Sequence, residues 1–500
     1  MEPPTQFFSS RAARMAALFI IFSLGIGIRL YDLTDLPLDF HPTRQLLSAI
    51  KTRGMYYQTR TDIAADERAF AIQQWKNRAS LEPEFFEHVV VFTYQFTGEQ
   101  LWVARIYSSL FWVIGGVFLF LLARRLASTD GAFAATVFYL FLPYAVIASR
   151  SFQPDPLMTM LIVIFLWAAY RWSEEPFSYR WAIIAGLFGG FAIFIKFPAV
   201  FFVAGGGLGA VLSRASVREA LKNPRLYVMT ILGILPGAVY FVYGVFIAGY
   251  LGQRFSGRFI PSLLINPSYY LGWVNMLNLV VGGLALTLGL LGLYFFEKEK
   301  RRFLLGLWAG YALFGFYFNF HISSHDYYSL PLIPIIALSL APLGGVLLSK
   351  LAEVAPFGIP RALIVCTLLF GLFAVNWNAR NQLSAVDYRP EAGMWAEIRE
   401  TVEGYNLAGL TQDYGSRLLY WGWRTSFAWP TYGDLYYRSE LRGSEFDFDA
   451  FFDQTVQRRD LFIVTDFHEL ERQPLLKERL KEYPVFAEGD GYVIYDIRDE

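Results

Sequence analysis

Long apolar runs alternate with short charged connections along most of the chain. A membrane-spanning helix needs about 20 mostly apolar residues, and the pattern predicts about eleven such spans. The first run is preceded by Arg11 and Arg14, and no small-residue cleavage site follows it. It is therefore expected to be an uncleaved transmembrane helix. The predicted spans are Met15–Ile28, Leu101–Ala123, Ala132–Ala148, Pro156–Tyr170, Trp181–Ile195, Phe197–Ser213, Leu226–Tyr250, Leu271–Phe296, Phe303–Phe320, Tyr328–Ser349 and Ala362–Trp377.

The distribution of Lys and Arg between the connections predicts the orientation of these spans, because cytoplasmic loops are enriched in both residues. With the N-terminus inside, every second connection is basic, for example Arg124/Arg125 and Lys298–Arg302. The short connections on the other side carry four cations: Arg150, Lys196, Arg254 and Arg258. These four oppose the bias and lie at predicted membrane boundaries, where a lipid phosphate would lie. The tail is expected on the extracytoplasmic face.

Two polar regions interrupt this pattern and set the expected domain organisation. Residues 1–377 form a transmembrane module that includes the first outer loop, 31–100, and residues 378–500 form an extracytoplasmic α/β domain. In the loop, Thr43–Tyr57 and Asp62–Arg78 have helical periodicity with charges on one face. Such helices lie along the membrane interface or cover the bundle as a lid.

The tail mixes strand and helix patterns. Leu461–Thr465 is an apolar run typical of a buried strand, Glu469–Glu482 is an amphipathic helix, and Val485–Ala487 and Tyr492–Asp496 are short strands. Binding an acceptor and covering the helical bundle are both open as roles for this domain.

Composition supports a membrane protein of mainly α class, a polytopic helical bundle. The chain has 500 residues, of which 55% are hydrophobic and 17% charged, whereas soluble domains carry about 45–50% apolar and about 25% charged residues. The formal net charge is zero, so there is no basic surface for nucleic acid. Cys366 is the single cysteine, which excludes an intrachain disulfide.

Two acidic residues are candidates for chemistry at the predicted outer boundary. Asp39 follows Pro37 and precedes an amphipathic helix; it is either a reactive carboxylate or a helix N-cap. Asp155 lies five residues after Arg150, between the third and fourth spans. A functional pair is favoured there, although Asp155 also suits a helix start and Arg150 would reach the interface by itself.

Cations and histidines at the same boundary complete the candidate set. Lys196 stands alone between two apolar helices, where it pairs with a phosphate or extends to the interface. Arg254 and Arg258 are four residues apart and would share a helix face. His321 and His325 are four residues apart, and Asp326 directly follows the second of them. No further ligand is near in sequence, so contact with a donor head group or sugar is favoured over a metal site.

An ordered series of motifs resembles the GT-C superfamily, in particular the branch of protein O-mannosyltransferases and the lipid A aminoarabinose transferase. The resemblance covers roughly residues 15–350. Its motifs are Leu33–Asp39, Glu82–Phe86, Ala104–Ser108, Ala123–Leu126, Ser149–Asp155, Lys196 with Pro198, and Tyr328–Pro334. No single motif is specific; the ordered set is.

The resemblance implies a polyprenyl- or dolichyl-phosphate sugar donor and transfer with inversion at the anomeric carbon. Asp39 would match the catalytic carboxylate of the family, and Asp155 its second acidic residue. The residues that would contact the lipid phosphate are Lys196, Arg254, Arg258 and Tyr328. Supporting residues around them would be His41, Arg44, Glu82, Arg105, Arg150, His321 and His325.

Two departures from the family pattern leave the donor open. Phe40 follows Asp39 where family members often have Asp-Glu, and Glu82-Pro83-Glu84 replaces Glu-Lys-Pro-Pro, which removes a phosphate-binding lysine. We expect a glycosyltransferase of the bacterial plasma membrane whose acceptor is a lipid, glycan or protein hydroxyl. Whether the reaction requires a divalent cation is left open by the sequence. A membrane transporter and a non-catalytic polysaccharide-assembly or flippase component are the alternatives; a transporter would show internal repeats and mid-span charges.

Overall fold

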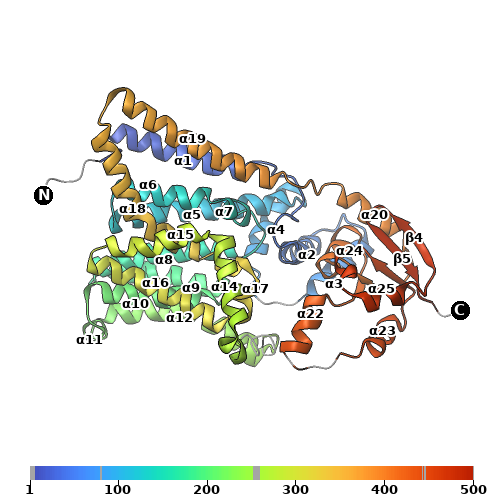
Figure 1. Ribbon diagram of the computed structural model, residues 1–500. Coiled ribbons are helices and arrows are strands. Elements are labelled where there is room, and N and C mark those ends of the chain that lie inside the picture. Colours follow the sequence, from blue (N-terminus) through green and yellow to red (C-terminus); the bar gives the residue numbers. More distant parts are fainter. Residues whose placement is uncertain (1–5, 79–81, 252–258, 442, 444–445, 499–500) are drawn as a thin grey trace. The chain divides into compact units, whose positions relative to one another are not determined.

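The chain folds into two compact units in the computed structural model, which describes residues 6–78, 82–251, 259–441, 443 and 446–498 (Figure 1). Unit 1 comprises Met1–Thr34 and Ala79–Ala385, and unit 2 comprises Asp35–Arg78 and Val386–Glu500. The first outer loop is therefore divided. Its amphipathic part groups with the tail, which differs from the expected assignment of the whole loop to the transmembrane module.

Unit 1 is helical in the part that the structure describes. Its helices are α1 (Arg11–Leu30), α4 (Phe85–Thr97), α5 (Trp102–Leu126), α6 (Thr129–Phe141), α7 (Pro143–Ala148), α8 (Asp155–Glu174), α9 (Tyr179–Ile195), α10 (Ala199–Arg214), α11 (Val217–Ala220), α12 (Pro224–Val242), α14 (Pro267–Val280), α15 (Gly283–Gly292), α16 (Lys298–Tyr317), α17 (Asn319–Ser324), α18 (Leu332–Val354) and α19 (Gly358–Leu383). Short 3-10 or π turns lie at Tyr243–Ile247, Pro261–Ile265, Leu293–Phe295 and Asp326–Ser329.

Among the described residues, six helices are long and apolar enough to cross a membrane, or seven if α14 and α15 form one bent span. The expected number of about eleven is not confirmed by this measure. Ala132–Ala148 is broken at Pro143 into two shorter helices, and α14 and α15 meet at 90° beside Gly282, whose φ is 81°. Two further apolar helices, α9 and α10, have 17 and 16 residues.

Helix α8 forms the centre of unit 1. Its sequence is apolar on all sides, which is typical of a helix surrounded by other helices, and 89% of its apolar window is buried. It packs against α5, α9 and α10, which run alongside it in Figure 1. Because α8 is held on every side, the residue at its first position, Asp155, has a well-defined place.

Glycines bring α10 and α16 into close contact. A Cβ atom on Gly205 would lie 2.5 Å from the carbonyl oxygen of Gly306 and 2.9 Å from Cα of Gly310. The two backbones therefore approach at a distance that no larger residue permits, as small residues commonly allow between membrane helices. Gly205 contacts Gly306 and Gly310, whereas Gly209, further along α10, contacts the earlier residue Phe303 of α16, so the two helices are antiparallel.

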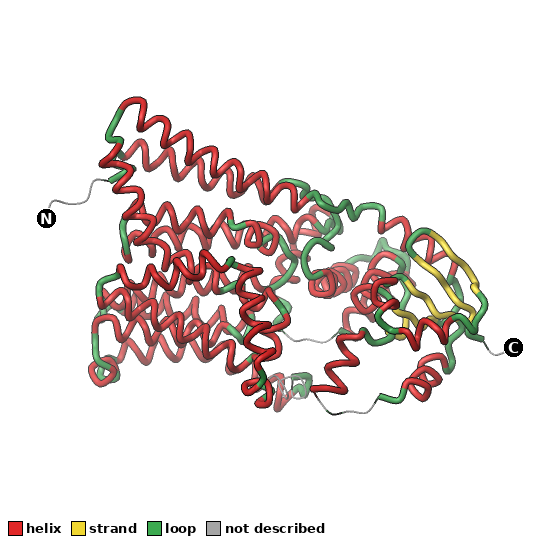
Figure 2. Tube along the Cα trace, viewed as in Figure 1, coloured by secondary structure: helices red, strands yellow, loops and turns green. Residues whose placement is uncertain are grey.

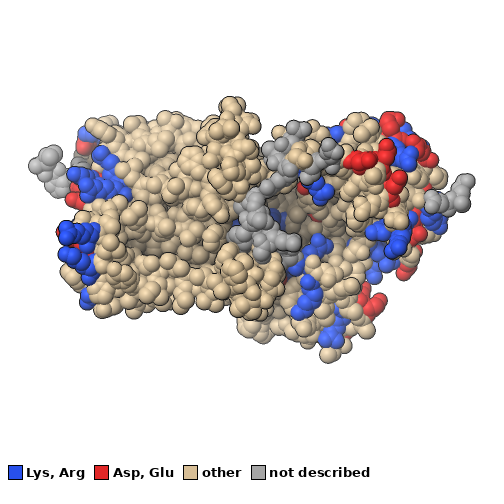
Figure 3. Space-filling view, turned by 90° about the horizontal axis from the view of Figure 1, so that it is seen from below, with Lys and Arg blue, Asp and Glu red and all other residues tan. Residues whose placement is uncertain are grey.

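Charged side chains of unit 1 concentrate at one end. Figure 3 shows Lys and Arg gathered there, while the part of the lateral surface seen in this view is uncharged. Helices α5, α8 and α10 each end with a basic residue in the last turn, which the helix dipole favours. An uncharged lateral surface is what a hydrocarbon environment requires.

Unit 2 contains a five-stranded sheet in the order β2-β1-β3-β5-β4 (Figure 2). Strand β1 pairs in parallel with β2 and β3, and β5 is antiparallel to β3 and β4. One face packs around Trp429 and Phe452 and the other around Trp395 and Ile398. The strands are β1 (Leu407–Leu410), β2 (Ser426–Ala428), β3 (Leu461–Val464), β4 (Val485–Gly489) and β5 (Tyr492–Asp496).

The helices of unit 2 come from both of its segments. They are α2 (Pro42–Gln58), α3 (Ala65–Asn77), α20 (Glu391–Thr401), α21 (Ser416–Trp421), α22 (Tyr432–Tyr436), α23 (Phe448–Val456), α24 (Phe467–Glu471) and α25 (Pro474–Leu480), with short 3-10 or π turns at Gln412–Gly415 and Tyr437–Leu441. The expected α/β character of the tail is confirmed. The single helix expected at Glu469–Glu482 is divided before Pro474, because proline cannot continue a helix without a break.

Both amphipathic helices expected in the first loop are present as α2 and α3. They pack against each other, and α2 also packs against α21 of the tail. Leu46, Ala49 and Ile50 of α2 are buried. These residues therefore contact protein, and the choice between a helix at the membrane interface and a lid over the bundle stays open.

We predict that Gly205→Ala lowers the stability of unit 1. The added methyl group would overlap Gly306, and overpacking of this kind costs about 1–3 kcal/mol. Thermal unfolding of the detergent-solubilised full chain would show a reduced midpoint. Gly371→Ala on α19 is the matched control, because nothing lies within 4 Å of its added Cβ. An equal midpoint for the two variants would contradict the close helix crossing.

Candidate active site

An ion pair between Asp155 and Lys196 lies buried in unit 1. Lys196 Nζ is 2.8 Å from each carboxylate oxygen of Asp155, and the two side chains are 5% and 3% exposed. Asp155 occupies the first turn of α8, and Lys196 follows the last residue of α9. The structure therefore brings two predicted site residues into direct contact. Lys196 is not the interface-reaching side chain of its non-functional alternative, whereas Asp155 does begin a helix, as its own alternative describes.

Two tyrosine rings lie beside this lysine. Lys196 Nζ is 5.0 Å from the ring centroid of Tyr327 and 5.3 Å from that of Tyr328, within the range of cation–π attraction. The side chain of Tyr144 interacts with the carboxylates of Asp326 and Asp155. Tyr328, expected at the lipid phosphate, thus lies at the predicted phosphate-binding cation.

The buried ammonium group of Lys196 requires an anionic partner, and more than one kind of anion can meet this requirement. A buried ammonium ion requires a partner, because its desolvation costs several kcal/mol. Asp155 supplies both oxygens to Lys196, and the rings of Tyr327 and Tyr328 add weaker stabilisation. A phosphodiester carries the same single negative charge as a carboxylate, so it is an equivalent anionic partner for Lys196.

The two predicted histidines lie next to this group. The ring of His321 is 5.1 Å from that of Tyr328, and His325 is 5.6 Å from His321. Asp326 begins the 3-10 turn that carries both tyrosines. Within the described part of the chain, no group of three or more His, Cys, Asp or Glu side chains is placed to hold a metal ion.

Two predicted supporting arginines meet at the turn after α1. Arg150 and Arg105 are each 1% exposed and donate to the backbone carbonyl of Asp32 at 2.9 and 3.4 Å. Asp32 itself has a left-handed φ of 48°, which is uncommon for a residue with a side chain. These contacts hold the chain where it leaves α1.

A third buried arginine, Arg29, was missed by the sequence analysis. It donates to Ser149 Oγ at 2.8 Å and to the carbonyl oxygens of Gly25 and Leu140, so its donors are well satisfied. Arg29 lies in the last turn of α1 and fixes the segment that precedes Arg150. In the sequence, Arg29 is a charged residue at the end of an apolar run. It therefore looks like an ordinary residue at a membrane boundary.

Gln153 also escaped the sequence analysis. It lies in the connection before α8, is fully buried, and neither polar atom of its side chain has a hydrogen-bond partner in the described chain. A buried amide without partners costs about 1–3 kcal/mol. Such a group two residues before Asp155 is a candidate for contact with bound substrate.

The other predicted residues of unit 1 are less informative. Glu82 lies near the phenol of Tyr240 on α12. Arg254 and Arg258 lie outside the residues that the structure describes. Their expected role at the donor phosphate stays a prediction.

Asp39 belongs to unit 2 and does not cap a helix. Helix α2 begins at Pro42, and its N-cap is His41, which has a left-handed φ of 44° and makes no side-chain capping bond. The carboxylate of Asp39 accepts from Gln45 Nε2 at 3.4 Å, and Arg44 follows in the first helical turn. The capping alternative for Asp39 is therefore wrong.

The environment of Asp39 is shared with Tyr388 in the same unit. Burial raises the pKa of Tyr388, and the negative charge of Asp39 raises it further. Asp35 accepts from the backbone N–H of Tyr388 at 3.0 Å. The start of the loop segment is thus attached to the start of the tail.

A second attachment runs through the first turn of α2. Thr43 donates to Asp413 at 2.8 Å, and Arg417 bridges Asp413 at 2.6 Å and Glu391 at 2.7 Å. Burial alone would lower the pKa of Arg417, but the two carboxylates raise it, so the guanidinium stays charged. Asp413 has a left-handed φ of 55°, directly after β1. The tail therefore fixes the backbone that carries Asp39.

Most of the predicted residues fall into two local groups. Unit 1 brings together Asp155, Lys196, Tyr328, His321 and His325. Unit 2 holds Asp39, His41 and Arg44 on one short segment. The predicted convergence of the two groups on one cavity stays a prediction.

Comparisons with known proteins bear on this arrangement. Residues 82–243 match the family model of dolichyl-phosphate-mannose-protein mannosyltransferases. The fold is similar to that of ArnT from Cupriavidus metallidurans bound to undecaprenyl phosphate, with a TM-score of 0.62 and 14% identity over 97% of this chain and 98% of that chain. It is also similar to the oligosaccharyltransferase AglB from Archaeoglobus fulgidus in complex with an inhibitory peptide and a dolichol-phosphate, with a TM-score of 0.55 and 12% identity over 94% and 72% of the two chains. No curated protein matches the chain.

ArnT and AglB are both GT-C glycosyltransferases, so the predicted resemblance to that superfamily is confirmed. The matched family model adds a mannosyltransferase-like segment that contains Asp155 and Lys196. The chain therefore has the fold of ArnT and AglB, together with a family match over residues 82–243.

We predict that Lys196→Met destabilises the protein by about 3–5 kcal/mol, because it leaves the buried carboxylate of Asp155 without its cation. Replacing both members, as Asp155→Leu with Lys196→Met, restores most of the loss. Thermal unfolding of the four proteins of this double-mutant cycle measures the coupling. As a control, Lys350→Met breaks the exposed pair with Glu353 and changes stability by less than about 1 kcal/mol. If the stability losses of the two single variants add up to the loss of the double variant, the two residues are not coupled as a buried pair.

Proposed function

We propose that this protein transfers a sugar from a polyprenyl-phosphate donor to an acceptor hydroxyl on the extracytoplasmic side of the membrane. The observation that carries the proposal is the buried Lys196–Asp155 pair beside Tyr328. The structure of ArnT was determined with undecaprenyl phosphate and that of AglB with dolichol-phosphate, which supports a lipid-phosphate donor of the same kind. The acceptor is a lipid, glycan or protein hydroxyl.

Lys196 holds the donor phosphate in this proposal. A polyprenyl-phosphate sugar is a phosphodiester, and when the bond from C1 to the phosphate oxygen breaks, the electron pair stays on that oxygen. The phosphate therefore gains a second negative charge during the reaction. A cation already in place stabilises this developing charge without further reorganisation. Asp155 keeps Lys196 positioned before the donor binds, and Arg254, Arg258 and Tyr328 add contacts to the phosphate.

Asp39 acts as the general base. The acceptor hydroxyl attacks C1 from the face opposite the leaving phosphate, and its proton passes to the Asp39 carboxylate. This single displacement inverts the configuration at C1. Support comes from the sequence resemblance and from the geometry of unit 2, where the Asp39 carboxylate accepts from Gln45 Nε2 and the N-cap of α2 is His41. The supporting residues His41, Arg44, Glu82, Arg105 and Arg150 orient the donor or hold the surrounding backbone.

The proposed topology has about eleven crossings, with the N-terminus in the cytoplasm and the tail outside, in a bacterial plasma membrane. Helix α8 joins the two ends of unit 1: Asp155 lies at its start, and Glu174 lies at its end among arginines. The arginine-rich end corresponds to the cytoplasmic side by the charge bias of membrane proteins. The pair of Asp155 and Lys196 then faces the extracytoplasmic side.

We expect Asp39→Asn to lower the rate of sugar transfer by about 10²–10⁴-fold, the usual contribution of a general base. Lys196→Ala lowers it by about 10²–10³-fold through loss of phosphate stabilisation. The measurement uses purified full chain and a panel of radiolabelled hexoses and pentoses linked to undecaprenyl phosphate, with release of undecaprenyl phosphate as the readout. The lipid that co-purifies with the wild-type protein selects the donor.

Matched controls separate chemistry from folding. Asp66→Asn changes an exposed carboxylate of the same loop, and Lys222→Ala an exposed lysine of unit 1; both retain wild-type turnover. Activities are compared below the unfolding temperature of each variant. Wild-type turnover in Asp39→Asn would end its assignment as base. Absence of sugar transfer by the wild-type protein from every donor of the panel would favour a non-catalytic or transport role.

Labelling of single cysteines tests the orientation. In a Cys366→Ser background, Asp490→Cys in the tail is expected to react with a membrane-impermeant maleimide in intact cells. Lys222→Cys, between α11 and α12, is expected to react only after the membrane is permeabilised. The reverse pattern would invert the proposed topology.

A further inference from the structure

A groove lies at the end of unit 1 that is remote from Asp155 and Lys196. Its volume is about 920 Å³, and its walls come from the end of α10, the start of α16 and the short helix α11. Helix α10 begins three residues after Lys196, and the groove is lined from Leu208 onward, which is roughly 14 Å further along the helix. The groove is therefore distinct from the active site.

The groove has a charged rim and an apolar wall. Arg214, Arg302, Glu219 and Glu299 supply two cations and two carboxylates, and Leu208 and Leu305 supply the wall. The two leucines are 52% and 47% exposed, and each lies further into its helix than the arginine beside it. Polar and apolar surfaces thus follow one another along the helices, as the head group and acyl region of a lipid do.

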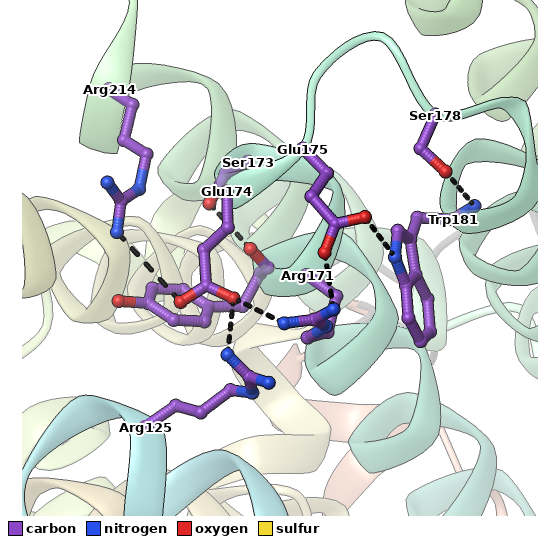
Figure 4. Close-up of polar contacts among 9 residues, drawn as sticks. Arg125, Arg171, Ser173, Glu174, Glu175, Ser178, Trp181 and Arg214 are labelled. Carbon is purple, nitrogen blue, oxygen red and sulfur yellow. Dashed lines mark hydrogen bonds and ion pairs between the residues drawn. The ribbon is translucent and has the colours of Figure 1, made fainter.

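A cluster at the same end of the bundle shows why Arg214 remains accessible (Figure 4). Glu174 accepts from Arg125 at 2.7 Å and from Arg171 at 3.0 Å, which already neutralises its charge. Arg214 approaches Glu174 to only 4.0 Å, and its side chain is 44% exposed. Arg171 also pairs with Glu175, so the two carboxylates balance Arg125 and Arg171, and Arg214 contributes its charge to the rim of the groove.

The remaining charges of the rim are also directed to the surface. Arg302 is exposed and makes one long hydrogen bond, 3.4 Å, to the carbonyl oxygen of Leu212. Glu219 accepts from the backbone and hydroxyl of Ser216, and these bonds lower its pKa, so it is anionic at neutral pH. The rim therefore presents positive and negative groups together, within one groove.

We propose that this groove binds a zwitterionic phospholipid with a primary amine in its head group, taken from the surrounding leaflet. The phosphate contacts Arg214 and Arg302, the ammonium contacts Glu219 and Glu299, and an acyl chain lies along Leu208 and Leu305. Equal numbers of cations and carboxylates match a head group of zero net charge. An anionic phospholipid would meet two carboxylates without any compensating ammonium.

The experiment uses the full chain in nanodiscs with phosphatidylethanolamine that carries a photoreactive diazirine on its acyl chain. Labelled peptides are identified by mass spectrometry and compared with those from phosphatidylglycerol bearing the same group. We expect preferential labelling by phosphatidylethanolamine of peptides that contain Leu208 and Leu305. Arg302→Ala reduces it by about fivefold, the effect of about 1 kcal/mol per surface cation.

Arg218→Ala is the matched control, because Arg218 is an exposed cation of α11 that does not line the groove. It leaves the labelling unchanged. Should Arg302→Ala fail to fold, Glu299→Gln provides the second test by removing the preference for phosphatidylethanolamine. Equal labelling by the two lipids, or equal labelling of Arg302→Ala and Arg218→Ala, overturns the proposal.

Discussion

A lysine ammonium buried against an aspartate carboxylate is the constraint on which the candidate site of unit 1 depends. Lys196 lies between α9 and α10, and Asp155 begins α8, so the pair joins three helices at one point. Burying either charge alone would be strongly unfavourable. The helices must therefore bring both groups to the same place, and the apolar, fully enclosed α8 ensures that they do. The tyrosines of the turn before α18 then complete the surroundings of the lysine.

In the proposed mechanism, one pair serves both stability and chemistry. Asp155 neutralises Lys196 in the structure, and the donor phosphate would give the lysine a second anionic partner whose charge grows as the bond to the sugar breaks. Two arginines, Arg105 and Arg150, are anchored on the Asp32 carbonyl and keep the neighbouring backbone in place. A rigid frame around a cation is what electrostatic stabilisation of a leaving group requires.

In unit 2, one segment carries the proposed base and another segment holds it in place. The segment with Asp39 has little structure of its own before α2, yet it is attached to the tail through Asp35 and through Thr43. The tail sheet provides a turn after β1 whose Asp413 and Arg417 hold that attachment. The tail is thereby more than an appended domain, because it determines the position of the loop that carries the proposed base.

The sequence alone determined the elements that depend on local patterns. Apolar runs predicted the spanning helices, 3.6-residue periodicity predicted α2 and α3, and Leu461–Thr465 and Tyr492–Asp496 were placed as strands where β3 and β5 are found. It also singled out Asp155 and Lys196, because charged groups at a membrane boundary stand out from their apolar neighbours. Tyr328 was named through the resemblance to the GT-C superfamily. Strands β1 and β2 were missed, since three or four residues carry too little periodicity to be recognised.

Only the tertiary structure decided which of these groups meet. Asp155 and Lys196 are 41 residues apart, and nothing local indicates that they pair rather than reach the interface separately. Arg29 and Gln153 resembled ordinary boundary residues until their burial was known. The first loop is divided between the two units because α2 packs against α21 of the tail, and this contact could not be predicted from local sequence. Local patterns specify helices and strands, whereas burial and partners arise from contacts between segments that are distant in the chain.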